Sequence, residues 1–436
     1  MLPPEIGRLI AYWSDPAISR TLRTLNRAYA STISTKDLHK AEAIWRWQYL
    51  GFFNMWCWLA SNGFTDLARP LLTRTTNEQN ERFLSLSAAY GHLENCEWIM
   101  KAAKPPLQYA LMNAVRYGHH QIVTHLLAAG ANHDSAYWYD AKLTGAGREV
   151  IRSASTVRLA ALWGHAEVLK TLLDAGANLD FNGNGDVALE QIVLRGHTAA
   201  FRILHDRGVR ASSAFEAACS AGHTGIVEIL LQSDSHLDRP KGTALESAAT
   251  NGHTEVVKIL IGANVDIASH GAHTLWVAAA KGHRDIVSAL LDGGVEQSDP
   301  CGGPIAAASS NGHMHILKLL LSHDTKPIPS DFDLAFQNAC RNGHFDIAKL
   351  LYETHPDLDV QNSEALRLAA AAGSIDIVTW LLSHGADPSV HKSRALKDAV
   401  RVNSVEIVEV LLAAGADIKD LDDEALLDAA KWGRVE

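Results

Sequence analysis

Apolar residues recur along this chain of 436 residues at spacings of three and four within short stretches. The stretches TEVVKILI (254–261) and VEIVEVLL (405–412) have this pattern. Such a spacing places the apolar side chains on one face of an α-helix, because the helix turns every 3.6 residues. Shorter apolar segments rich in small residues lie between these stretches, as in ALESAATNG (244–252) and ALRLAAAAG (365–373). The pattern therefore predicts small-residue helices that alternate with amphipathic helices.

A glycine ends each small-residue segment, and histidine usually follows it. These anchor glycines are Gly63, Gly91, Gly118, Gly164, Gly196, Gly222, Gly252, Gly282, Gly312, Gly343 and Gly373, and Asn403 and Gly433 continue the series. From Gly222 onward the spacing is 30 or 31 residues. Glycine, and next asparagine, adopts the positive φ that closes a helix. Each unit is therefore predicted to be an inner helix, a tight turn and an outer helix. Pro70 lies within the first expected outer helix, which we expect to be bent or irregular.

Acidic residues and histidines repeat with the glycines. Acids stand three positions after the anchor at Asp66, Glu94, Glu167, Glu255, Asp285, Asp346, Asp376 and Glu406. A negative charge in the first turn of a helix is stabilised by the helix dipole, so we interpret these acids as structural. Histidine follows the glycine at His92, His119, His165, His197, His223, His253, His283, His313 and His344. Equivalent positions in a stack of helices lie ~10 Å apart, too far to share one metal ion. No motif for catalysis is present, so we expect no enzyme, metal or cofactor.

Composition narrows the classes of partner. The formal charge of −10 and the absence of a Lys/Arg-rich run disfavour nucleic acid and anionic membrane surfaces. The most apolar stretch, 44–60, is too short to span a bilayer. A polar start containing Glu5 argues against a secretory signal. The cysteines Cys57, Cys96, Cys219, Cys301 and Cys340 form no C-x-x-C pair, which suits a reducing compartment. We therefore expect a cytoplasmic protein, a nuclear protein, or both.

The repeated units resemble ankyrin repeats. The resemblance lies in GHTEVVKILIGANVDI (252–267) and AAKGHRDIVSALLDGG (279–294). It implies an all-α, ankyrin-type solenoid of about twelve helix pairs over residues 45–436, with protein partners bound in the concave groove lined by inner helices. The chain stops three residues after Gly433, so the last repeat is expected to be incomplete. The segment 423–433 is then either a half cap or the end of a truncated product.

Aromatic residues distinguish the early repeats. The position before the anchor glycine, which ankyrin proteins expose in the groove, holds Tyr90, Tyr117 and Trp163 in three successive units, with Arg116 beside Tyr117. Tyrosine, tryptophan and arginine concentrate binding energy at interfaces. These four residues are therefore predicted to bind a partner. The alternative is that they contact the loop inserted nearby.

The inserted loop occupies residues 133–156, where the spacing of anchors widens from about 30 to 46 residues. It contains Tyr137, Trp138 and Tyr139. These aromatics either form a local cluster that holds the loop together or act as a second set of anchors for a partner.

The beginning of the chain belongs to no repeat. Residues 2–29, LPPEIGRLIAYWSDPAISRTLRTLNRAY, resemble an F-box, which defines a predicted helical motif at 1–44. The resemblance implies docking on a Skp-type adaptor of a cullin-RING ubiquitin ligase. The implied docking residues are Leu2, Pro3, Ile6, Leu9, Ile10, Pro16, Leu22 and Leu25. The predicted function is thus a substrate-recognition subunit of such a ligase. The alternative is a plain ankyrin scaffold whose N-terminal helices only cap the first repeat.

Overall fold

The computed structural model describes residues 52–134, 155–179, 185–209, 213–232, 243–263, 267–297, 303–323, 329–355, 358 and 363–421. The chain divides into two compact units, residues 1–211 and 212–436. The F-box-like segment, with all of its implied docking residues, lies outside the described residues, as do Tyr137, Trp138, Tyr139 and the segment 423–433.

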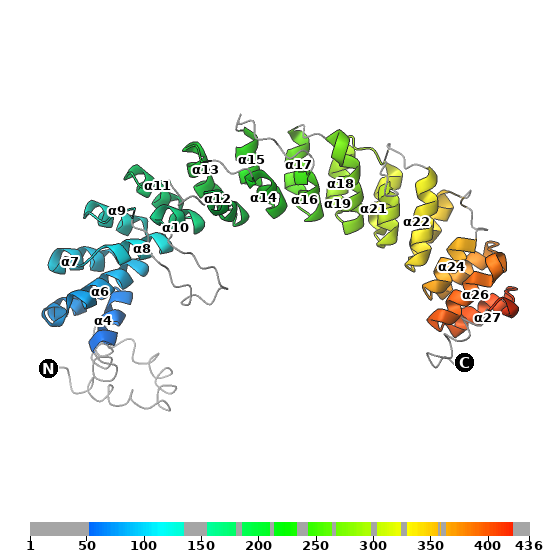
Figure 1. Cartoon of the computed structure of the whole chain (residues 1–436), viewed down its shortest axis with the longest axis horizontal. Helices are drawn as coiled ribbons and strands as arrows, with labels where there is room; N and C mark the ends of the chain where they lie inside the picture. The colour runs from blue at the N-terminus through cyan, green and yellow to red at the C-terminus, as the bar shows by residue number, and fades with distance from the viewer. Residues whose placement is uncertain are drawn as a thin grey trace, which may run out of the picture. The chain divides into compact units, whose positions relative to one another are not determined.

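Helices follow one another in pairs within each unit (Figure 1). The pairs of the first unit are α4 (Phe52–Ser61) with α5 (Thr65–Ala68), α6 (Asn77–Ala89) with α7 (Leu93–Ala103), α8 (Gln108–Tyr117) with α9 (His120–Ala128), α10 (Thr156–Leu162) with α11 (Ala166–Asp174), and α12 (Gly185–Leu194) with α13 (Thr198–Asp206). A 3-10 helix, η1 (Arg69–Arg74), follows α5.

The second unit continues the same order. Its pairs are α14 (Ala214–Ala221) with α15 (Thr224–Gln232), α16 (Thr243–Thr250) with α17 (Thr254–Gly262), α18 (Ile267–Lys281) with α19 (Arg284–Asp292), α20 (Gly303–Ser310) with α21 (Met314–Ser322), α22 (Pro329–Arg341) with α23 (Phe345–Thr354), α24 (Ser363–Ala371) with α25 (Ile375–Ser383), and α26 (Val390–Val402) with α27 (Val405–Ala413), followed by the 3-10 helix η3 (Ile418–Asp420). The described residues thus contain twelve helix pairs and no strand, which confirms the predicted all-α repeat fold.

The helices of each unit form two layers. The even-numbered inner helices pack on one another in chain order, as α4, α6 and α8 do, and most odd-numbered outer helices do the same. The inner helices approach closely because small residues line their contacts, as with Ala248 and Ala249 of α16, which are fully buried. Each outer helix contributes the apolar residues of its three-and-four pattern, such as Val257 and Leu260 of α17. The core therefore lies between the two layers along the whole of each unit.

The anchor glycines adopt the expected backbone conformation. All eleven from Gly63 to Gly373 have φ between +71° and +84°, and Asn403 has φ +61°. An outer helix begins shortly after each of these turns. The repeating acid lies in the first turn of that helix, as Glu94 does in α7 and Glu255 does in α17. The turn conformation of the glycines is thus confirmed, and the first-turn position of the acids agrees with their stabilisation by the helix dipole.

Eight of the histidines that follow an anchor glycine join their repeat to the preceding one. His92 donates a hydrogen bond from Nε2 to the carbonyl oxygen of Ser61, at 2.9 Å. Seven more histidines make the equivalent bond: His119, His165, His197, His253, His283, His313 and His344. The ring of the histidine in the next repeat occupies the space where a side chain would begin on eight anchor glycines: Gly63, Gly91, Gly118, Gly164, Gly222, Gly252, Gly282 and Gly312. A glycine is therefore required there for its small size as well as for its backbone conformation.

The first repeat is irregular at the place expected. Its outer helix α5 ends at Ala68 and continues as the 3-10 helix that contains Pro70. Proline lacks the backbone N–H that an α-helix needs, so the helix changes type there. The inner helix α4 is regular and buries Trp56 against Phe83 of α6, with ring centroids 4.5 Å apart.

Candidate functional site

Three large aromatic side chains stand exposed at the ends of successive inner helices of the first unit. Tyr90, Tyr117 and Trp163 are 60%, 50% and 44% exposed. Tyr90 and Trp163 are the C-cap residues of α6 and α10, and Tyr117 is the last residue of α8. Because α6, α8 and α10 pack side by side, the ends of these helices form one continuous strip (Figure 1).

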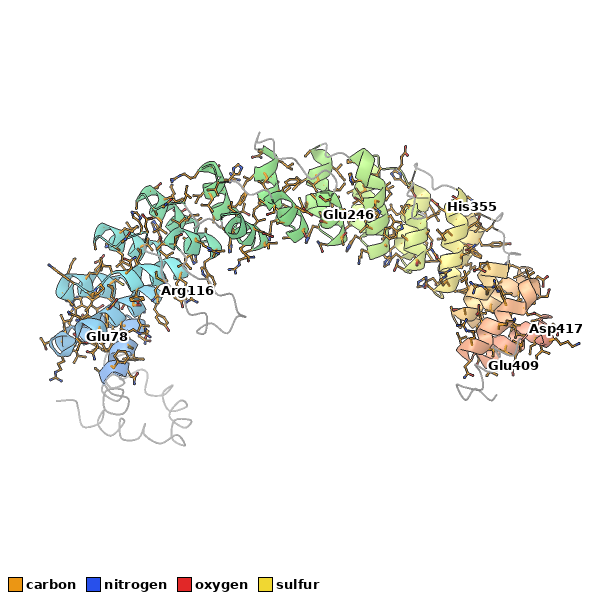
Figure 2. All side chains as sticks on the ribbon, viewed as in Figure 1. Glu78, Arg116, Glu246, His355, Glu409 and Asp417 are labelled. Atoms are coloured by element: carbon orange, nitrogen blue, oxygen red, sulfur yellow. The ribbon has the colours of Figure 1, made fainter. Side chains whose placement is uncertain are left out.

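Arginine side chains lie over two of these rings, those of Tyr117 and Trp163. The guanidinium of Arg116, which Figure 2 labels on α8, lies 5.3 Å from the ring centroid of Tyr117 and 5.7 Å from that of Trp163. Arg195 lies 5.9 Å from the same Trp163 ring and donates a hydrogen bond to the carbonyl oxygen of Leu162. Trp163 therefore has two guanidinium groups within cation–π distance.

Arg195 belongs to this site although the sequence analysis did not single it out. It occupies the position before Gly196, the same repeat position as the three aromatics. The repeat position is the signal that would have found it. We call Tyr90, Arg116, Tyr117, Trp163 and Arg195 the aromatic–arginine strip.

The same repeat position has a different role in the second unit. There Asn251, Asn311 and Asn342 donate side-chain hydrogen bonds to the last carbonyl oxygens of their own helices, and Asn251 and Asn342 also bond to the preceding repeat. The asparagine side chains therefore fold back onto their own helices. The aromatic side chains of the strip instead expose apolar surface, which is typical of a binding surface.

The two ends of the inserted loop are bonded to each other and to the repeat that follows it. Thr156 donates a hydrogen bond from Oγ1 to the carbonyl oxygen of His133. Asp134 accepts a hydrogen bond from the backbone N–H of Asn178 at 2.9 Å, and this bond lowers the pKa of the Asp134 carboxyl. The repeats on both sides of the insertion therefore hold their register despite the added residues.

Three of the described cysteines are unsuited to act as nucleophiles or metal ligands, because both roles need the thiolate. Burial raises the pKa of Cys96, Cys219 and Cys340 to about 12, so these thiols stay protonated near neutral pH. Cys219 and Cys340 are fully buried in inner helices, which agrees with a packing role. In the part of the chain that the structure describes, no three metal-ligating side chains gather, and no helix is long and apolar enough to cross a membrane.

An ion-pair network joins two inner helices of the second unit. Arg367 of α24 bonds Glu364 at 2.6 Å and reaches Asp398 of α26 at 2.9 Å, and Arg401 also lies near Asp398, at 3.4 Å. The hydrogen bond from Arg367 lowers the pKa of the Glu364 carboxyl and raises that of the guanidinium. The charges of this network are matched within the chain, so it links repeats and offers no unmatched charge to a ligand.

Comparison with models of protein families identifies the same repeats as the structure does. A family model described as ankyrin repeats in three copies matches residues 189–270, 214–301, 275–362, 305–392 and 336–422, and a single ankyrin-repeat model matches residues 106–136. Neither model describes an enzyme.

Among solved structures, the chain is similar to the ankyrin repeat domain of human ASB11, at 23% identity and a TM-score of 0.39, with 48% of this chain and 96% of that chain covered. A search of curated proteins found no match. The overlapping family matches run without a gap from residue 189 to residue 422, which is more than half of the chain. This chain is therefore a member of the ankyrin-repeat family.

Proposed function

We propose that this protein is an interaction adaptor and that the aromatic–arginine strip is where it binds its partner protein. Ankyrin repeats serve protein–protein interaction, and the strip gives that general role a location. The observation that carries the proposal is the exposure of three aromatic rings on successive inner helices, those of Tyr90, Tyr117 and Trp163. Arg116 and Arg195 lie over the last two of these rings. Aromatic residues and arginine dominate the binding energy of protein interfaces.

The test is affinity capture with the purified full-length chain. Changing both Tyr117 and Trp163 to alanine should abolish retention of the proteins that the wild-type chain captures, because a hot-spot side chain contributes ~2–4 kcal/mol. The thermal melt followed by circular dichroism should change little, since both side chains are about half exposed. The matched control is Lys281→Ala, which alters an exposed residue at the same repeat position of the second unit.

Two outcomes would contradict the proposal. Capture that survives in the Tyr117→Ala/Trp163→Ala variant would place the binding surface elsewhere. A large fall in melting temperature of that variant would mean that the two rings stabilise the repeats themselves.

We further propose that the captured protein is presented to a cullin-RING ubiquitin ligase. The support is the resemblance of residues 2–29 to an F-box, which includes the opening LPPEI and the pair Asp15-Pro16. In this proposal the N-terminal segment binds a Skp-type adaptor while the repeats hold the substrate. The Skp-type adaptor and the substrate must be bound at the same time. Their two binding surfaces therefore have to lie on separate parts of the chain.

A pulldown with recombinant Skp-type adaptor tests the ligase proposal. The full chain should be retained, and Leu9→Asp with Ile10→Asp should reduce retention to background, because a charge at an apolar contact loses its burial energy and adds a desolvation cost. Lys281→Ala should bind as the wild type does. If the wild-type chain is not retained above a bead control, the ligase link should be abandoned while the adaptor proposal stands.

A further inference from the structure

Basic side chains gather on one face of three packed inner helices of the second unit, α22, α24 and α26 (Figure 1). Positions nine, six and two residues before the anchor share one face of an inner helix, because residues three and four apart are helix neighbours. In these three helices the positions hold Leu334, Gln337, Arg341, Glu364, Arg367, Ala371, Arg394, Lys397 and Arg401, none of which is buried. We call Arg341, Arg367, Arg394, Lys397 and Arg401 the basic face.

The same positions differ in the earlier repeats of the second unit. They hold Glu216 in α14 and Glu246 in α16, which Figure 2 labels, and no lysine or arginine in α14, α16, α18 or α20. On α26, by contrast, Arg394, Lys397 and Arg401 follow one another at spacings of three and four. Like charges at such spacings destabilise a helix, and local costs of this kind are typical of functional surfaces.

Two arginines of the basic face stand outside the ion-pair network of Arg367 and Arg401. Arg341 of α22 and Arg394 of α26 are exposed, and within the described residues neither makes a salt bridge or a side-chain hydrogen bond. The acid closest to Arg341 along α22 is Asp333, eight residues earlier, which is ~12 Å along the helix axis. The basic face therefore has positive charge beyond what its own carboxylates balance.

These two arginines act on the same region of the surface. The hydrogen bond from Arg367 is the largest cause of the lowered pKa of the Glu364 carboxyl, and the charges of Arg341 and Arg394 lower it further. Helices α22 and α26 lie on either side of α24, so at ~8–10 Å per helix the two arginines are ~16–20 Å apart across the face. An extended polypeptide spans that distance with about six residues, at ~3.3 Å each.

A polypeptide fits this face better than a nucleic acid does. The evenly spaced phosphates of a nucleic acid would meet Glu364 and Asp398 within the face, and the chain as a whole has a formal charge of −10. A polypeptide can instead place acidic side chains opposite the arginines and neutral ones opposite these carboxylates. Arginine clusters recognise acidic motifs because a guanidinium can bind a carboxylate through two parallel hydrogen bonds.

We infer that the basic face of α22, α24 and α26 binds an acidic segment of a partner protein. Carboxylates of that segment pair with Arg341 and Arg394, and the segment crosses the three inner helices between them. This surface lies in the second unit and goes beyond the proposed role of the aromatic–arginine strip, which lies in the first.

Fluorescence anisotropy with the full-length chain tests this inference. The labelled probes are two capped peptides of equal length, in which glycine alternates with glutamate or with glutamine, and a thymidine oligonucleotide with the charge of the glutamate peptide. The glutamate peptide should bind about tenfold more tightly than either of the other probes. Its binding should weaken as salt rises from about 50 to about 500 mM, because exposed charges are screened.

Variants locate the binding of the glutamate peptide. Arg341→Gln with Arg394→Gln should weaken it about tenfold. The matched control, Arg284→Gln with Lys318→Gln, removes the same charge from exposed residues of outer helices in the second unit and should bind as the wild type does. Both double variants should melt as the wild type does in circular dichroism, because the four side chains are exposed.

Several outcomes would overturn the inference. Glutamate and glutamine peptides that bind equally, or a glutamate peptide that does not bind at about 1 mM, would show that the face has no preference for acids. An oligonucleotide that binds as tightly as the glutamate peptide would assign the face to nucleic acid. An equal loss of binding in the two double variants would mean that binding follows net charge alone.

The outcomes also separate this inference from the proposed function. The Tyr117→Ala/Trp163→Ala variant should bind the glutamate peptide as the wild type does, because its changes lie in the first unit. A loss of the peptide in that variant would contradict the location proposed here. Failure of the glutamate peptide with the wild-type chain would overturn this inference and leave the capture of proteins by the strip unaffected.

Discussion

Replacing Trp56 by alanine should destabilise the first unit by ~3–5 kcal/mol, the usual cost of removing a large buried aromatic side chain. Trp56 is fully buried in α4, and its ring lies 4.5 Å from Phe83 and 6.4 Å from Trp98 between ring centroids. Its Nε1–H also donates to the backbone carbonyl oxygen of Gln79 at 3.0 Å. The variant would therefore lose packing on α6 and α7 and leave a carbonyl group without this donor.

Urea unfolding and amide hydrogen exchange would measure the effect. The midpoint should fall, and protection should be lost first in α4 to α7, because each repeat is stabilised mainly by its neighbours. The matched control is Trp58→Ala in the same helix. Trp58 is only half-buried and lies against Phe64, so its loss should be smaller, ~1 kcal/mol. Equal losses for the two variants would show that burial against α6 is not what stabilises α4.

Gly222→Ala should destabilise the second unit more than Gly373→Ala does, although both glycines have similar backbone conformations. Their φ angles are +80° and +71°, so an added Cβ costs ~1–2 kcal/mol at either site. At Gly222 the new Cβ would lie 2.6 Å from Nδ1 of His253, whereas at Gly373 it would meet nothing within 4 Å. The displaced His253 would then lose its 2.9 Å bond to Ser220, adding ~1–2 kcal/mol to the loss.

A double-mutant cycle isolates this histidine contribution. The change Gly222→Ala should cost about as much in a His253→Ala background as Gly373→Ala costs in the wild-type protein, because the ring that blocks the Cβ is gone. Urea titration gives the free energies of unfolding of the wild type, the two single variants, the double variant and Gly373→Ala. An unchanged cost in the His253→Ala background would mean that only the backbone conformation demands glycine.

The repeat fold was predictable because its determinants are local. The three-and-four pattern, the small-residue segments and the turn glycines each act within a few residues, so the helix pairs, the positive φ at Asn403 and the break at Pro70 all follow from short stretches. The role of the histidines was not predictable in the same way. The partner of His165 is the carbonyl oxygen of Arg116, 49 residues earlier, and only the stacking of repeats brings the two together.

The candidate site was likewise predictable only in part. The repeat position alone identified Tyr90, Tyr117 and Trp163, because residues before the anchor glycine share one place in every unit. Arg195 shares that repeat position, but its contact with Trp163, at 5.9 Å, depends on the packing of α10 beside α12.

The sequence by itself determined the class of fold, the length of the repeat and the repeat positions of the proposed binding residues, because helix periodicity and turn chemistry act over short range. The tertiary structure decided which side chains meet between repeats: the histidine bridges, the exposure of the three rings and the guanidinium groups placed over them. Apart from the stacking of Arg116 on its neighbour Tyr117, these contacts join residues about thirty or more positions apart, and their geometry is fixed only when neighbouring inner helices pack.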